Sequence, residues 1–78
     1  MKEYVIINEF TNTYFSYFTK KNKIPMFYPN IAFARFFYDR DYAEKTIKHI
    51  IDSGTAFDRE FYKLNVTDAK QITWTTRQ

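Results

Sequence analysis

The sequence contains no cysteine and only one histidine among its 78 residues. No disulfide and no cysteine-ligated zinc site can form, and one imidazole leaves little for metal chemistry. Gly54 is the only glycine, which excludes the glycine-rich loops that hold phosphates in P-loop and Rossmann proteins. We therefore expect no cofactor and no bound metal.

Long apolar runs are also missing. No stretch approaches the roughly 20 residues that a membrane-spanning helix needs. The N-terminal residues MKEYVIINEF form too short and too interrupted a run for a signal peptide. These absences predict a cytoplasmic protein with no membrane contact.

Catalytic groups are scarce. Ser16 and Ser53 are the only serines, and no nucleophile motif surrounds either of them. His49 falls near the end of a predicted helix, where a structural role is favoured. Asp39 and Asp41 could bind a hard cation, but helix capping explains them better. The sequence therefore predicts a protein that is not an enzyme.

Aromatic residues, by contrast, are abundant: they make up 22% of the chain, with nine Phe, seven Tyr and one Trp. Each ring can bury roughly 150–250 Å², whereas a domain of this size buries only about 60% of its unfolded surface. Packing every ring inside one small core would be difficult. We expect some of them to form an exposed apolar patch.

The charge balance is mildly basic, with 12 Lys and Arg against 9 Asp and Glu, a net charge of +3. Dedicated duplex-binding proteins usually carry a stronger basic stripe. Residue usage favours Lys, Asn, Ile, Phe and Tyr, and Leu64 is the only leucine. The favoured residues have AT-rich codons, which is typical of low-GC genomes such as those of many phages.

The first 19 residues predict a β-hairpin. Residues 3–9 and 13–19 are rich in β-forming residues, and Asn12 between them can adopt a positive φ. In the second strand, alternation predicts that Phe15 and Tyr17 share one face. Both faces of each strand are apolar or aromatic, whereas a sheet with one solvated face should be polar on that side.

Residues 20–30 are predicted to be the longest irregular segment of the chain, because their two prolines discourage regular strand pairing. They are either a solvated hairpin tip or a loop that contacts a partner. Three clustered lysines favour a solvated hairpin tip, whereas the consecutive Met26, Phe27 and Tyr28 favour a loop that contacts a partner. Residues 31–38 then read as a third strand or as an extended approach to the helix.

A helix is predicted between an acidic cap and Gly54. Asp39 or Asp41 can cap it, and Asp41 with Glu44 matches a capping box. Gly54 is placed where a left-handed residue often ends a helix. The apolar stripe predicted to face the sheet consists of Ala43, Ile47, Ile50 and Ile51.

Two more strands are predicted at residues 61–66 and 71–76, unless they form one irregular strand. The element order is then β-β-β-α-β-β. This order predicts an α+β fold, with a mostly antiparallel sheet of four to five strands packed on one face by a single amphipathic helix. We expect residues 1–78 to form one compact domain without a linker.

The same residue types predict a binding surface. Aromatic residues, Met and Arg are enriched at the cores of protein interfaces. Aromatics interleaved with basic residues also suit single-stranded nucleic acid. Two further possibilities are a homodimer that hides the rings, and a long loop that buries them within the monomer. The residues expected to contact a partner are Tyr17, Lys20, Lys21, Lys23, Met26, Phe27, Tyr28 and Arg35.

A short aromatic strand leads directly into the acid-capped helix, with ARFFYD at residues 34–39 and YAE at residues 42–44. Together with the N-terminal YVI hairpin, this order resembles small phage-encoded β-β-α-β counter-defence proteins, among them anti-CRISPRs. The resemblance implies a stoichiometric inhibitor that binds a host nuclease, a CRISPR effector or a toxin in an infected bacterium. It covers the order of elements and a few positions, so no site residue is transferred.

Overall fold

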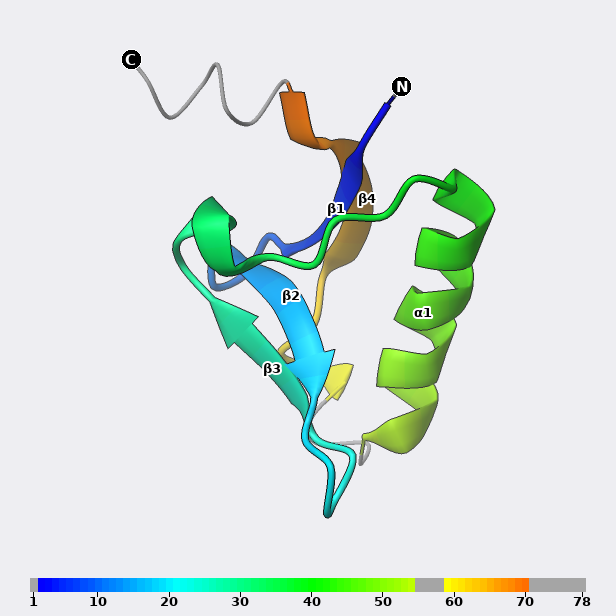
Figure 1. The fold of residues 1–78 in the computed structure, drawn as a ribbon. Coiled ribbons are helices and arrows are strands. Elements are labelled where there is room, and N and C mark those ends of the chain that lie inside the picture. The colour runs from blue at the N-terminus through cyan, green and yellow to red at the C-terminus, as the bar shows by residue number, and fades with distance from the viewer. Residues whose placement is uncertain (1, 55–58, 71–78) are drawn as a thin grey trace.

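The computed structural model describes residues 2–54 and 59–70 and has an α+β fold (Figure 1). A four-stranded antiparallel sheet has the strand order β3-β2-β1-β4, and one long helix packs against one of its faces. Within the described part of the chain, no helix combines the length and the apolar character needed to cross a bilayer. The elements are β1 (Tyr4–Asn8), β2 (Thr13–Phe18), β3 (Pro25–Tyr28), the 3-10 helix η1 (Ile31–Phe33), α1 (Arg40–Ser53) and β4 (Leu64–Asp68).

The third and fourth strands differ from the prediction. β3 lies inside the stretch expected to be irregular, and the predicted third strand instead begins with η1. Pro25 is tolerated because β3 lies at the edge of the sheet, with β2 as its only neighbour among the described strands. β4 ends at Asp68, two residues beyond the predicted strand. The predicted strand at residues 71–76 lies outside the described residues.

A β-bulge at Ser16 changes which side chains share a face of β2. Phe15 pairs with Phe27, but Tyr17 pairs with Met26, so Ser16 has no partner on β3. The extra residue reverses the alternation. Phe15 and Phe18 consequently both face α1 and lie 5.1 Å apart between ring centres. The prediction that Phe15 and Tyr17 share a face is wrong for this reason.

The segment between η1 and α1 fills a gap in the sheet. β1 and β2 pair only at their connected ends, where Ile7 lies opposite Tyr14. Beyond that point the backbone N–H of Arg35 donates to the carbonyl of Phe15 at 2.9 Å. Phe37 and Tyr4 exchange two backbone hydrogen bonds of 2.7 and 2.8 Å. The extended approach to the helix is therefore the correct alternative, and it also takes part in the sheet.

Helix α1 begins after Asp39, whose carboxylate accepts a 2.9 Å hydrogen bond from the backbone N–H of Asp41. Asp39 is thus the N-cap, and Asp41 lies in the first turn instead of capping. Gly54 has a φ of −92° and a ψ of 167°, an extended conformation, so the predicted left-handed ending is wrong. The buried helix residues are Ala43, Thr46 and Ile50, and Ile47 packs partly buried beside them.

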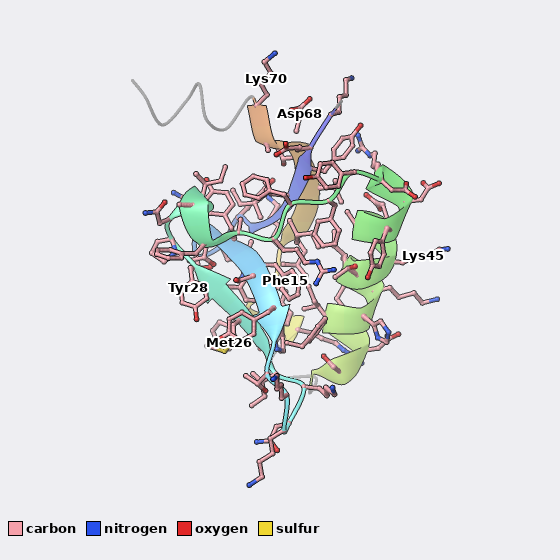
Figure 2. All side chains as sticks on the ribbon, in the orientation of Figure 1. Phe15, Met26, Tyr28, Lys45, Asp68 and Lys70 are labelled. Atoms are coloured by element: carbon pink, nitrogen blue, oxygen red, sulfur yellow. The ribbon has the colours of Figure 1, made fainter. Side chains whose placement is uncertain are left out.

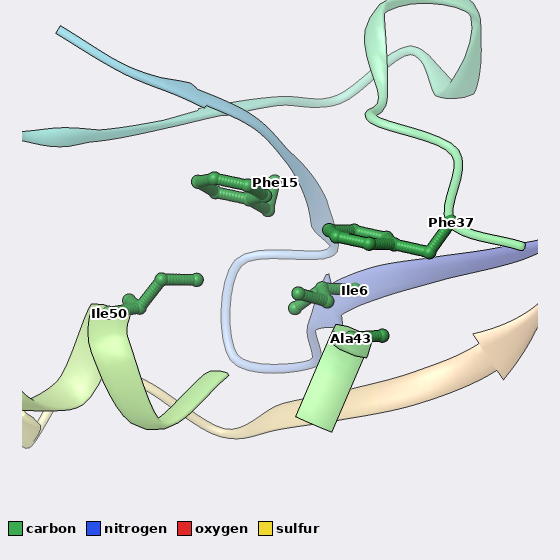
Figure 3. Packing of buried hydrophobic residues seen from close by; sticks show 5 residues of the cluster. All are labelled: Ile6, Phe15, Phe37, Ala43 and Ile50. Carbon is green, nitrogen blue, oxygen red and sulfur yellow. The ribbon is translucent and has the colours of Figure 1, made fainter. Parts of the chain in front are cut away.

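Two hydrophobic clusters cover the two faces of the sheet. The first lies between the sheet and α1, where its side chains point toward one another (Figure 3), and consists of Ile6, Phe15, Phe37, Ala43 and Ile50. The second lies on the opposite face and consists of Val5, Tyr14, Ala34 and Ala69, with Ile7 and Ile31 packed against it. Segments on both sides of the sheet thus explain why both faces of residues 3–9 are apolar.

Candidate binding surface

On the side of the β2–β3 hairpin that points away from α1, three aromatic rings lie in a row, which we call the aromatic row: Tyr17 and Tyr28 of the hairpin and Phe33 of η1. The ring centres of Tyr17 and Tyr28 are 6.3 Å apart with an interplanar angle of 26°, a stacked arrangement. The Phe33 ring lies 5.9 Å from that of Tyr28. Tyr17 is 46% exposed and Phe33 is 60% exposed. Such contacts hold the rings in place while leaving much of their surface accessible.

The bulge at Ser16 builds this row. Because it reverses the alternation in β2, Tyr17 leaves the helix side and stacks on Tyr28. Met26 and Tyr28 alternate with Phe27 along β3, so they share the outer face. Figure 2 shows Met26 and Tyr28 on the side of the hairpin away from α1, with Phe15 between the sheet and the helix.

The two tyrosines of the row also interact through their hydroxyl groups. The Tyr17 and Tyr28 oxygens are 3.2 Å apart and share a hydrogen bond. This bond is the main cause that raises the pKa of Tyr28 above its ordinary value. Partial removal from water and the negative charge of a Tyr17 phenolate raise that pKa further. The Tyr28 phenol therefore holds its proton more tightly than an ordinary tyrosine does.

Three exposed lysines occupy the tip of the same hairpin, Lys20, Lys21 and Lys23. The turn is closed by hydrogen bonds between Thr19 and Ile24, including 2.9 Å from the Thr19 N–H to the Ile24 carbonyl. Lys23 has a φ of 55°, in the left-handed region that glycine or asparagine occupies at lower cost. None of the three lysines forms an ion pair within the described residues.

Phe27 is separated from the other expected contact residues. Its side chain packs against the helix-side cluster, with ring centres 5.9 Å from Phe15 and 5.7 Å from Tyr62. The prediction treated residues 20–30 as one irregular loop, in which consecutive side chains need not alternate. In the edge strand, alternation turns Phe27 toward the core and leaves Met26 and Tyr28 outside.

Arg35 is exposed but does not belong to the aromatic row. Its guanidinium carbon lies 5.5 Å from the centre of the Phe37 ring and 6.0 Å from that of Tyr42. Those two rings are perpendicular, with centres 5.6 Å apart. Since Phe37 belongs to the helix-side cluster, Arg35 lies on the helix side of the sheet.

Sequence reasoning missed two residues of these surfaces, Phe33 and Tyr42. Residues 31–38 were predicted to be a strand or an extended approach to the helix, whereas η1 presents Phe33 beside Tyr28. Asn30 gave a local signal, because its side chain accepts a 2.9 Å hydrogen bond from the Ala32 N–H and begins η1. No local signal places Tyr42 under Arg35, because that contact depends on how residues 35–37 cross the sheet.

A mostly apolar cleft of about 440 Å³ lies between the hairpin tip and the end of α1. It is lined by Phe18, Lys23, His49 and Ser53, and the His49 ring meets the Phe18 ring edge to face at 6.4 Å. In residues 2–54 and 59–70, no group of three His, Asp or Glu side chains is arranged to hold a metal ion. We assign no chemistry to this cleft.

Comparison of the chain with protein-family models, with curated proteins and with solved structures finds no match.

Proposed function

We propose that this chain is a small, non-catalytic binding protein that contacts a protein partner through the aromatic row, with the lysines of the hairpin tip as a basic rim. The observation that carries the proposal is the row itself: the Tyr28 ring contacts both Tyr17 and Phe33, and these two outer rings are exposed. Large, rigid aromatic side chains dominate the binding energy of protein interfaces.

The hairpin is well suited to such a contact because it is already ordered. β2 and β3 pair along their whole length apart from the bulge, and ring contacts fix the side chains. Binding by a preformed surface avoids much of the entropy lost when flexible side chains are immobilised. The nearby lysines would steer an acidic partner toward the row.

For the partner, we propose a host defence protein or a nucleoprotein complex, such as a CRISPR effector, a nuclease or a toxin. This identification rests on the resemblance to phage-encoded counter-defence proteins and on the AT-rich codon bias of the residue usage. In that role the chain acts in the cytoplasm of an infected bacterium, and one copy blocks one target molecule.

A second candidate function is binding of single-stranded nucleic acid, alone or within the same complex. The observation that favours it is the position of the three tip lysines on the hairpin that carries the row. Bases can stack on exposed rings while cations hold the phosphates. The net charge of +3 is modest for this role, so protein binding is the first proposal.

Phe33 and Phe10 provide a matched pair of variants, because the two side chains are 60% and 62% exposed. Phe33 belongs to the row, whereas Phe10 lies in the β1–β2 turn and meets no other ring of the described residues. Tagged wild-type protein, Phe33→Ala and Phe10→Ala are each used to capture proteins from nuclease-treated bacterial lysate. We expect one protein to be retained by the wild type and by Phe10→Ala, and to be depleted with Phe33→Ala.

Equal retention by both variants would rule out the aromatic row as the contact. Loss of every partner on nuclease treatment, with affinity that falls steeply as salt rises, would instead support nucleic-acid binding. In that case the tip lysines are the next residues to change.

A further inference from the structure

Arg35 carries a guanidinium group that lies near two aromatic rings and has no anionic partner among the described residues. Its distances to the ring centres of Phe37 and Tyr42 are 5.5 and 6.0 Å, within the range of cation–π contacts. Within residues 2–54 and 59–70, no carboxylate lies within ion-pairing distance of it. The positive charge is therefore fixed in position and available to a ligand.

The backbone around Arg35 is fixed from both sides. Its own N–H is hydrogen-bonded to β2 at Phe15, and Phe37 is bonded twice to β1 at Tyr4. Phe37, the nearer of the two rings, is only 3% exposed and is buried in the core. The N–H groups of a guanidinium near aromatic rings can still bind a carboxylate through two parallel hydrogen bonds.

We propose that Arg35 binds one carboxylate, supplied by an aspartate or glutamate of the protein partner. This inference rests on the proposed protein-binding function and names the chemical group that a second contact point would recognise. Arg35 lies on the helix side and the aromatic row on the opposite face, so such a partner extends around the edge of the hairpin.

The surrounding charges favour a carboxylate over a strand of phosphates. Asp39 and Asp41 follow Arg35 closely in the chain, are exposed, and lie at the start of α1, whose first turn also contains Tyr42. A nucleic acid passing Arg35 would bring several negative charges close to these acids. The tip lysines, which could offset that repulsion, lie beyond the far end of β2 (Figure 1).

The test compares two soluble probes, an end-blocked peptide that contains a single glutamate and pentathymidylate. Each is titrated into the full chain while the Nε–H signals of its arginines are followed by NMR. Arg40, which is exposed in the first turn of α1, serves as the internal reference. We expect the peptide to shift the Arg35 signal saturably and by more than the Arg40 signal, and pentathymidylate to affect both equally.

Three variants distinguish carboxylate binding that needs the guanidinium geometry of Arg35 from attraction by positive charge alone. Arg35→Lys keeps the charge but loses the planar fork, so the affinity for the peptide should fall about tenfold, the equivalent of one charge-assisted hydrogen bond. Tyr42→Leu removes the exposed supporting ring and should also weaken binding, whereas Arg40→Lys should leave it unchanged.

Equal shifts at Arg35 and Arg40 with the peptide would overturn the proposal, as would unchanged affinity in Arg35→Lys. A selective response to pentathymidylate would reassign the group to phosphate. Because these titrations need no partner, their failure is distinguishable from failure of the proposed function, which is measured by capture with Phe33→Ala.

Discussion

The side-chain oxygen of Asn8 accepts a 3.0 Å hydrogen bond from the backbone N–H of Lys63, a residue 55 positions later in the chain. The same oxygen accepts a second bond, from the Phe10 N–H at 3.2 Å, and the side-chain nitrogen donates to the carbonyl of Phe61 at 3.0 Å. Asn8 is only 3% exposed. One buried amide thus joins the end of β1 to the next turn and to the segment that precedes β4.

Replacing this amide should destabilise the fold. Asn8→Ala leaves two backbone N–H groups and one carbonyl without their partner in a partly buried place, which costs about 1–3 kcal/mol of the free energy of unfolding. Urea denaturation followed by circular dichroism measures the loss. Asn65→Ala is the control, because the Asn65 side chain is exposed and among the described residues bonds only to the Glu9 side chain. Equal stability of the two variants would contradict the role assigned to Asn8.

The helix-side cluster predicts a larger effect at Ile50, which is fully buried. Ile50→Ala should lower the free energy of unfolding by about 2–5 kcal/mol, because it removes packed methyl groups and leaves a cavity. Ile24→Ala, at the exposed hairpin tip, should change it by less than about 0.5 kcal/mol. Thermal unfolding of the two variants tests the assignment, and a wild-type midpoint for Ile50→Ala would refute the packing of α1.

The tyrosine pair predicts a pH dependence in the alkaline range. Folding raises the pKa of Tyr28, mainly through the hydrogen bond with Tyr17, so the folded state holds this proton more tightly. The resulting stabilisation is complete below the unfolded pKa of about 10 and is lost as the pH rises through the folded pKa. Tyr17→Phe should bring the pKa of Tyr28 back toward its ordinary value. NMR of the Tyr28 ring signals during an alkaline titration measures it, and an unchanged titration curve for Tyr28 would exclude the hydroxyl contact.

The left-handed backbone of Lys23 predicts a stabilising substitution. Glycine adopts a φ of 55° without the clash of a Cβ atom, so Lys23→Gly should raise the free energy of unfolding by about 0.5–1 kcal/mol. Lys21→Gly removes the same charge from the same turn, where φ is not positive, and should not stabilise. Equal changes in both variants would point to the shared loss of charge instead of the backbone.

Local patterns predicted much of the framework. β-forming residues placed β1 and β2 to within one residue of their observed ends, and the expected positive φ of Asn12 is confirmed at 56°. The helix was predicted from its acidic cap and apolar stripe, because capping and helical spacing act within a few neighbouring residues. The α+β class followed from these elements.

Local patterns did not predict the candidate surface in full. Tyr17, Met26, Tyr28 and the tip lysines were named from their residue types, but Phe27 was included although it faces the core. Phe33 was missed because η1 replaced a predicted strand. Residue type indicates that a side chain suits an interface, whereas the strand to which it belongs decides its face.

By itself, then, the sequence determined the helix, the first hairpin and the excess of aromatic rings. Only the tertiary structure decided where the rings lie: the bulge at Ser16 turned Tyr17 outward, and the crossing of residues 35–37 between β1 and β2 set Arg35 on its two rings. The physical reason is that both features depend on pairing with distant segments, and a one-residue change in register exchanges the two faces of a strand.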